Sequence, residues 1–196
     1  MKEILFVILK AYADWEAAPL AAAINRADGF CVKTVSTSKN PIRSIGGFTV
    51  NPDYDIDEAS EKDFAGLVLI GGNSWRTKEA EKVAKLVRIA VRKNTVIGAI
   101  CDGTVFLGNI GLLNDVDHTS NQLEDLQNYA GKNYTGAERY KLQQAVRCGN
   151  IVTANGTANM EFGKEMLSAL HVMTEEEAEQ WYRFYKFGYY ESMKKD

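Results

Sequence analysis

Cys101 is the residue in this chain whose surroundings most clearly favour chemistry. An apolar run over residues 96–100 predicts a strand, and a helical pattern begins directly after Cys101. Ala99 and Gly103 lie two residues on either side, and a tight strand-to-helix turn requires such small neighbours because backbone segments come close there. A helix N-terminus favours the reactive thiolate. A buried cysteine that packs as a small hydrophobe is the alternative, and the spacing favours a reactive thiol.

Backbone N–H groups for a developing negative charge are expected on two sides of Cys101. One belongs to Asp102, the next residue in the turn. On the other side, Gly71 and Gly72 follow a neighbouring apolar strand, and glycine lets a backbone approach a substrate closely. An ordinary turn at a strand end is the alternative for these glycines. The Asp102 carboxylate should also reduce the reactivity of Cys101, because a nearby negative charge raises the pKa of a thiol.

Two acidic residues, Asp14 and Glu16, follow the first predicted strand at residues 4–9. The carboxyl ends of parallel strands meet at one edge of a sheet, so either side chain could face Cys101. A carboxyl group held near a thiolate has a raised pKa and can donate a proton. We favour Glu16 and keep Asp14 as the alternative, because the spacing to Pro19 does not fix the alignment. A solvated glutamate in a first helical turn would need no functional explanation.

The elements that position these residues alternate between apolar strands and amphipathic helices, which predicts a mostly parallel sheet with helices on both faces. We expect strands at residues 4–9, 31–35, 66–70, 96–100 and 151–154, with a small extra strand at 46–50. Helices are expected at residues 15–27, 78–92, 102–111, 160–170 and about 174–195. Residues 128–150 are interpreted as irregular or partly paired loop.

Composition narrows the class of protein. A chain of 196 residues, 45% hydrophobic and 25% charged, suits one soluble domain over residues 1–196. A net charge of −3 without a basic cluster argues against a nucleic-acid partner, and no apolar run is long enough to span a membrane. Three widely spaced cysteines make no disulfide framework, so we expect a reducing cytoplasm. No metal-ligand or phosphate-loop spacing occurs, so no metal or cofactor is expected.

The other two cysteines have simpler interpretations. Cys31 lies in a predicted strand of alternating apolar residues and is expected to pack there. Cys148, next to Gly149, is interpreted as structural, with a secondary oxidation site as the alternative.

The C-terminal helix carries a row of aromatic side chains. Thr174 and Glu177 form a capping box that starts the helix. One face of this helix then carries four aromatic residues, Trp181, Phe184, Tyr185 and Tyr189. Such a stripe packs either against its own domain or against a second subunit, and it leads us to expect a homodimer.

The motifs around Cys101 resemble the ThiJ/PfpI family, which includes the Parkinson-associated protein deglycase. They are VIGAICDG at residues 96–103 and GLLN at 111–114, with DWE at 14–16, LIGGN at 69–73 and IVTANG at 151–156 in support. The resemblance runs from about residue 3 to about residue 172. It implies a flavodoxin-like three-layer α/β sandwich with a nucleophile elbow at Cys101, and frequent dimerisation. Relatives include peptidases, deglycase- or glyoxalase-type enzymes, isonitrile hydratases and non-enzymatic stress proteins.

The resemblance also implies roles for residues around the thiol. Relatives carry an acidic residue that hydrogen-bonds the sulfur, which corresponds to Glu16. A glycine amide that corresponds to Gly72 contributes to their anion pocket, together with the amide at Asp102.

Histidine is where this chain departs from its relatives. Peptidase-like relatives carry histidine directly after the nucleophile, where this chain has Asp102, so peptidase activity of that kind is not expected. Deglycase-like relatives carry histidine at the end of a Thr-Ser-type segment twenty residues on; the stretch here is HTSN at 118–121, and a gapless count reaches Asn121. His118 and Asn121 are therefore both candidates. His171 follows a predicted helix and is expected to be structural.

These observations predict a cysteine-dependent hydrolase or lyase that acts on a small electrophile, in the manner of an amidase, deglycase or glyoxalase. Cys101 is the nucleophile, Glu16 handles the proton, and the amides of Gly72 and Asp102 form the anion pocket. One alternative is a redox or stress-responsive protein without catalysis, in which Cys101 is oxidised reversibly. Another is a binding or scaffold protein with a vestigial pocket.

Overall fold

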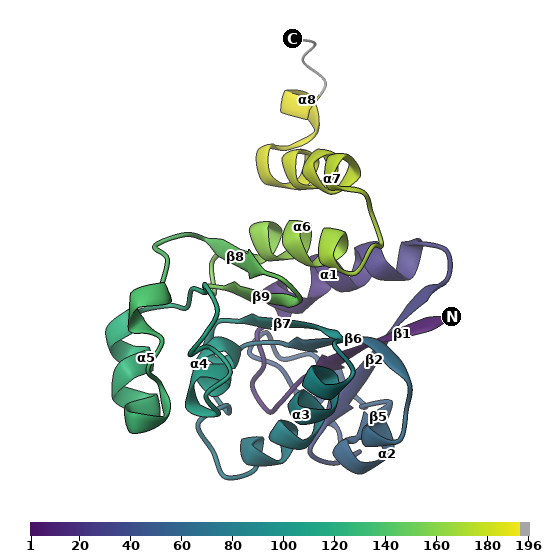
Figure 1. Cartoon of the computed structure of the whole chain (residues 1–196). Helices are drawn as coiled ribbons and strands as arrows, with labels where there is room; N and C mark the ends of the chain where they lie inside the picture. The colour runs from purple at the N-terminus through teal and green to yellow at the C-terminus, as the bar shows by residue number, and fades with distance from the viewer. Residues whose placement is uncertain (193–196) are drawn as a thin grey trace.

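A seven-stranded sheet lies at the centre of the molecule, which the computed structural model describes over residues 1–192 (Figure 1). All neighbouring strands are parallel except the last pair, β9 and β8. In spatial order the strands are β5 (Tyr54–Asp55), β2 (Phe30–Ser36), β1 (Lys2–Val7), β6 (Phe64–Leu69), β7 (Val96–Ile100), β9 (Ile151–Ala154) and β8 (Ala145–Cys148). A separate hairpin joins β3 (Ile42–Arg43) to β4 (Thr49–Val50).

Helices cover both faces of this sheet, which confirms the predicted flavodoxin-like α/β sandwich (Figure 1). One face carries α1 (Asp14–Arg26) and α6 (Asn159–Ala169), with α7 (Glu175–Phe187) packed on α6. The other face carries α2 (Ile56–Ser60), α3 (Ala84–Arg92), α4 (Asp102–Asn109) and α5 (Leu123–Ala130). Short 3₁₀ turns are η1 (Ala80–Val83), η2 (Gly131–Asn133) and η3 (Ala137–Arg139).

The alternation of side chains along each strand builds two separate cores. In β1, Leu5 and Val7 face the core under α2 to α5, whereas Ile4 and Phe6 face the core under α1 and α6. Successive side chains of a strand point to opposite faces, so a strand covered on both sides is apolar throughout. This is why the predicted strands appear in the sequence as unbroken apolar runs.

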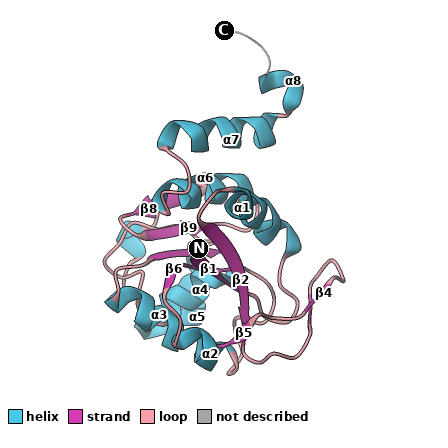
Figure 2. Ribbon diagram, turned by 90° about the vertical axis from the view of Figure 1, so that its right-hand side faces the viewer, coloured by secondary structure: helices cyan, strands magenta, loops and turns pink. Residues whose placement is uncertain are grey.

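The C-terminal region differs from the prediction of one helix over about 174–195. The capping box of Thr174 and Glu177 starts α7 as expected. The helix ends at Phe187, because Gly188 has a φ of +91° that does not continue a right-handed helix. A short α8 (Tyr189–Ser192) follows, and residues 193–195 of the predicted range lie outside the described residues. Figure 2 shows that α7 lies outside α6, away from the sheet.

Residues 128–150 agree with the interpretation as irregular or partly paired loop, although the paired strand itself was not predicted. Strand β8, which contains Cys148, pairs with β9 through a two-residue turn at Gly149 and Asn150. Gly149 has a φ of +57°, as the first position of such a hairpin turn requires. The short helices α2 and α5 and the edge strand β5 were also not predicted, because their apolar patterns are too brief. No helix in residues 1–192 is long and apolar enough to cross a membrane.

Candidate active site

Cys101 lies in a strained turn between β7 and α4. Its φ of 56° and ψ of −130° are unusual for a residue with a side chain, and backbone strain of this kind is concentrated at functional sites. Its carbonyl oxygen accepts hydrogen bonds from the backbone N–H (3.0 Å) and the Oγ1 hydroxyl (2.6 Å) of Thr104, which hold the turn. A side chain at Gly103 would lie 2.8 Å from the carbonyl oxygen of Leu69, which explains the small residue there.

The order of the strands brings the ends of β6 and β9 to either side of the thiol. Gly71 follows β6 and Gly156 follows β9, and both strands pair with β7. A Cβ at Gly71 would lie 2.5 Å from the Cβ of Cys101. A Cβ at Gly156 would lie 3.0 Å from the sulfur. Backbone without side chains therefore surrounds Cys101 on both sides.

Glu16, in the first turn of α1, is the acidic residue that faces the thiol. Its side chain is fully buried, and Oε2 accepts a hydrogen bond of 2.8 Å from the backbone N–H of Gly71. Within residues 1–192, Oε1 has no donor in hydrogen-bonding geometry. The position of a Cβ at Gly156 lies 3.2 Å from this oxygen and 3.0 Å from the Cys101 sulfur, so both atoms border the same point.

Asp14, the alternative to Glu16, has another partner. Its Oδ2 accepts a hydrogen bond of 2.7 Å from the backbone N–H of Gly46, next to the β3–β4 hairpin. Tertiary structure therefore places Glu16, the acidic residue favoured from the sequence, at the thiol and turns the alternative Asp14 away from it.

The thiol and the Glu16 carboxyl group influence each other's protonation. Burial raises the pKa of Glu16 to about 7, although the N–H of Gly71 opposes the shift. Burial, and then the Glu16 carboxylate, raise the pKa of the Cys101 thiol, and the donors at Asn121 and Asp102 oppose this. The sequence analysis expected the helix N-terminus to favour the thiolate; burial and the Glu16 carboxylate oppose that effect. The thiolate is favoured when Glu16 holds the proton.

Asn121 donates a hydrogen bond from Nδ2 to the Cys101 sulfur at 3.2 Å. Its Oδ1 accepts the backbone N–H of Gly156 at 2.8 Å, which fixes the amide with its nitrogen toward the sulfur. The carbonyl of Gly156 in turn accepts the indole N–H of Trp15 at 3.2 Å. Of the two candidates in the HTSN segment, the structure brings Asn121 to the thiol.

His118 is not brought to the thiol. It is fully buried in the core, where Nδ1 bonds the carbonyl of Val116 (2.7 Å) and Nε2 bonds the hydroxyl of Tyr134 (2.6 Å). Burial lowers its pKa, as expected for a neutral structural imidazole. His171 lies exposed just after α6, so neither histidine supplies a base to Cys101.

Gly72 follows Gly71 directly and packs against the backbone of Ala11 and Tyr12. Its φ is +140°, and a side chain would collide with the carbonyl of Ala11. The N–H of Gly71 is used by Glu16, so Gly72 is the glycine of this pair whose amide is a candidate anion donor.

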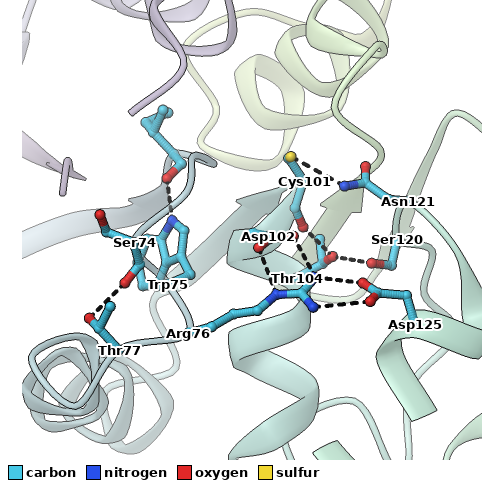
Figure 3. A network of polar contacts seen from close by, with 11 residues as sticks. Ser74, Trp75, Arg76, Thr77, Cys101, Asp102, Thr104, Ser120, Asn121 and Asp125 are labelled. Carbon is cyan, nitrogen blue, oxygen red and sulfur yellow. Dashed lines mark hydrogen bonds and ion pairs between the residues drawn. The ribbon is translucent and has the colours of Figure 1, made fainter. Parts of the chain in front are cut away.

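Arg76 is the residue at this site that sequence reasoning missed. Its guanidinium bonds both carboxylate oxygens of Asp102 at 2.9 and 3.0 Å and both oxygens of Asp125 at 2.6 and 3.0 Å (Figure 3). The three residues are far apart in the sequence, so no local pattern could reveal the cluster. In residues 1–192 no group of three or more His, Cys, Asp or Glu side chains is arranged to hold a metal ion.

Comparison with known proteins agrees with the fold. The model of the DJ-1/PfpI family matches residues 2–169. The chain belongs to the DJ-1/PfpI family. Among relatives of this DJ-1/PfpI protein, the uncharacterized protease YdeA of Bacillus subtilis is 41% identical over 97% of this chain and 94% of its own length. The predicted family resemblance is thereby confirmed.

Two solved structures closely match this DJ-1/PfpI protein. A ThiJ/PfpI family protein from Bacillus anthracis has a TM-score of 0.88 and 31% identity, covering 97% of this chain and 93% of its own. The DJ-1 superfamily protein Atu0886 from Agrobacterium tumefaciens has a TM-score of 0.86 and 33% identity, covering 95% and 99%.

Proposed function

We propose that this protein is a cysteine-dependent hydrolase or lyase that acts on a small electrophile such as an α-oxoaldehyde, an amide or an isonitrile. The observation that carries the proposal is the convergence at Cys101. The sulfur, the free Oε1 of Glu16 and the amide of Asn121 border one point beside a strained turn. A nucleophile, a proton carrier and hydrogen-bond donors are what covalent catalysis requires.

The first step transfers the thiol proton of Cys101 to the carboxylate of Glu16. The sulfur then forms a bond to the electrophilic carbon, and the electron pair of the broken π-bond moves to the substrate heteroatom. For a carbonyl substrate, the N–H groups of Gly72 and Asp102 stabilise the resulting oxyanion. Glu16 returns its proton to that oxygen or, for an amide, to the leaving nitrogen as the C–N bond breaks, which restores the carboxylate. Water then attacks the acyl-enzyme, and breakage of the C–S bond releases the acid and the Cys101 thiol.

Peptidase activity is a weaker proposal for this chain, although YdeA is named an uncharacterized protease. Peptidase-like relatives carry histidine directly after the nucleophile, and here that residue is Asp102, whose carboxylate pairs with Arg76. A carboxylate in an ion pair does not replace an imidazole as a base near neutral pH.

Cys101→Ser should abolish turnover of the substrate class that the wild type accepts, with a loss of at least about 10²-fold, because a serine hydroxyl is far less ionised than a thiol. The measurement is consumption of an α-oxoaldehyde, a primary amide and an isonitrile by both proteins. Cys148→Ser is the matched control, because Cys148 lies in β8 and should leave turnover unchanged. Equal turnover by wild type and Cys101→Ser would contradict the proposal.

The same site supports a second candidate, a redox protein in which Cys101 is oxidised reversibly. The Asn121 amide and the Asp102 N–H act on the sulfur and could equally hold the oxygens of an oxidised sulfur. No turnover in the panel, together with selective oxidation of Cys101 by limiting peroxide in mass spectrometry, would favour this candidate.

We also propose a cytoplasmic homodimer with one domain over residues 1–196. All three cysteines are free, which suits a reducing compartment. In the aromatic stripe, Trp181 packs over Gly163 within the chain. The other aromatic side chains of the stripe remain partly exposed, Phe184 to 39%, Tyr185 to 48% and Tyr189 to 57%. A contiguous exposed apolar patch of this kind marks a protein–protein contact, whereas single exposed aromatics do not.

Light scattering at micromolar concentration should therefore give twice the monomer mass of 21.8 kDa. Tyr185→Glu should shift the mass toward the monomer, because a buried unpaired charge opposes association. Tyr129→Glu, on α5 at the opposite face, is the control that should leave the dimer intact. A monomer mass for the wild type would refute the dimer.

A further inference from the structure

Arg76 lies in the loop between β6 and η1 and joins two helices of the site. Its guanidinium is held by Asp102 at the start of α4 and by Asp125 in α5, each through two hydrogen bonds (Figure 3). The centroid of the Tyr129 ring lies 5.1 Å from the guanidinium carbon. Paired, two-point bonding of this kind fixes an arginine in direction as well as in position.

The two ends of this contact belong to the two segments that carry the candidate anion donors. Arg76 follows Gly72 closely in the loop that borders the site, and Asp102 follows Cys101 directly in the turn. The contact therefore ties the loop of the candidate donor Gly72 to the nucleophile elbow. The neighbouring Trp75 also packs against α4, with its ring centroid 5.1 Å from that of Phe106, but it brings no charge to Asp102.

The contact also places a positive charge on the carboxylate nearest to the thiol along the chain. The charged groups that act on the Cys101 sulfur are Glu16 from α1 and Asp102 from α4, and both oppose the thiolate. Asn121, which also faces the sulfur, is neutral. The side chain of Asp102 is only 17% exposed, so water screens its charge poorly and Arg76 is its counter-ion.

We propose that Arg76 is a positioning residue with two effects. Its guanidinium keeps the Asp102 carboxylate in an ion pair, and this contact fixes the elbow at Cys101 against the Gly72 loop. It acts on Cys101 through Asp102 and does not touch the substrate. Asp125 is the outer anchor that orients the guanidinium. The inference rests on the proposed role of Cys101 as the nucleophile.

The test is a double-mutant cycle of Arg76→Gln and Asp102→Asn, read as the pH dependence of iodoacetamide labelling at the Cys101 peptide. In the wild-type background, Arg76→Gln should raise the labelling midpoint by about half to one pH unit, a roughly three- to tenfold loss of thiolate below the midpoint. In the Asp102→Asn background, Arg76→Gln should shift the labelling midpoint by less than about half of that amount, because no carboxylate beside the thiol loses its counter-ion.

Equal shifts in the two backgrounds would mean that Arg76 acts only as a distant charge, and no shift would mean that it does not act on the thiol. Either result overturns the proposal. Arg139→Gln is the matched control, because it removes the same charge from a pair with Asp117 elsewhere and should leave the midpoint unchanged.

Arg76→Lys provides a second route if Arg76→Gln fails to fold in circular dichroism. Lysine keeps the positive charge but lacks the planar guanidinium that bonds both carboxylates at two points each. The labelling midpoint should therefore rise by less than in Arg76→Gln, and only when Asp102 is present. A rise of the same size in the Asp102→Asn background, where no carboxylate follows the thiol, overturns the proposal. Labelling needs no substrate, so these results stay separate from a failure of the proposed catalytic activity.

Discussion

Glu16→Gln is expected to lower turnover of the accepted electrophile by about 10²–10⁴-fold, the usual contribution of a positioned proton carrier. Glutamine has the shape of glutamate and its carbonyl oxygen can still accept the N–H of Gly71. It cannot take the thiol proton or return it. The measurement is kcat and KM at pH values from about 5 to 9, with the loss expected in kcat.

The same substitution should have the opposite effect on alkylation. The Glu16 carboxylate raises the pKa of the Cys101 thiol, so its removal lowers that pKa and speeds iodoacetamide labelling at about pH 7 to 8. Unfolding alone would also stop turnover and expose the thiol to iodoacetamide, so a thermal melt must show that the variant is folded. In a folded variant, slower turnover with faster labelling is a specific result. It separates a group that carries protons from one that only shapes the pocket.

The pH profile provides a further check. Burial raises the pKa of Glu16 to about 7, and the mechanism starts from the carboxylate. Wild-type activity should therefore rise as the pH increases through about 7, and Glu16→Gln should lose this limb. A carboxyl group with a higher pKa in the folded than in the unfolded protein lowers the free energy of unfolding at pH values above its unfolded-state pKa. Below that pKa the group is protonated in both states and has no such effect. Glu16→Gln should accordingly be no less stable than the wild type at about pH 8.

Asp14→Asn is the matched control for Glu16→Gln, because Asp14 lies in the same helical turn and bonds Gly46 instead of facing the thiol. It should retain turnover and the wild-type pH profile. Turnover by Glu16→Gln within about threefold of the wild type would exclude Glu16 as the proton carrier.

Gly156→Ala is expected to lower kcat/KM by about 100-fold, the cost of displacing reacting groups by about an ångström. The new methyl group would lie 3.0 Å from the Cys101 sulfur and 3.2 Å from Oε1 of Glu16, at the point that both atoms border. It would also disturb the N–H of Gly156 that orients the Asn121 amide. Steady-state kinetics and the rate of Cys101 alkylation at one pH measure the effect.

Gly163→Ala controls for crowding in general. Its methyl group would lie 2.6 Å from the ring of Trp181, between α6 and α7 and away from the thiol. Both substitutions should reduce stability, by about 1–3 kcal/mol for an overpacked contact, and thermal melts measure this. Only Gly156→Ala should slow the chemistry. If both variants keep wild-type alkylation rates, the space beside Gly156 is not where the electrophile binds.

The strands and the elbow could be predicted because their signals are local. Residues 96–100 form β7 as expected, and Cys101 occupies the strained turn that the spacing of Ala99 and Gly103 indicates. A strand buried on both faces needs an unbroken apolar run, and a tight turn needs small neighbours. Both requirements are met by residues adjacent in the chain. Brief elements such as α5 and β8 carry too few apolar residues for the same inference.

The side chains that meet at the thiol were decided by tertiary structure. The sequence alone predicted Cys101, and it left Glu16 beside Asp14 and Asn121 beside His118 as open pairs. One member of each pair reaches the sulfur, because helix direction and strand register turn the other toward Gly46 or into the core. Arg76 had no local signal, since its partners lie 26 and 49 residues away. Spacing along a chain fixes backbone turns, whereas contacts between distant side chains depend on how the layers pack.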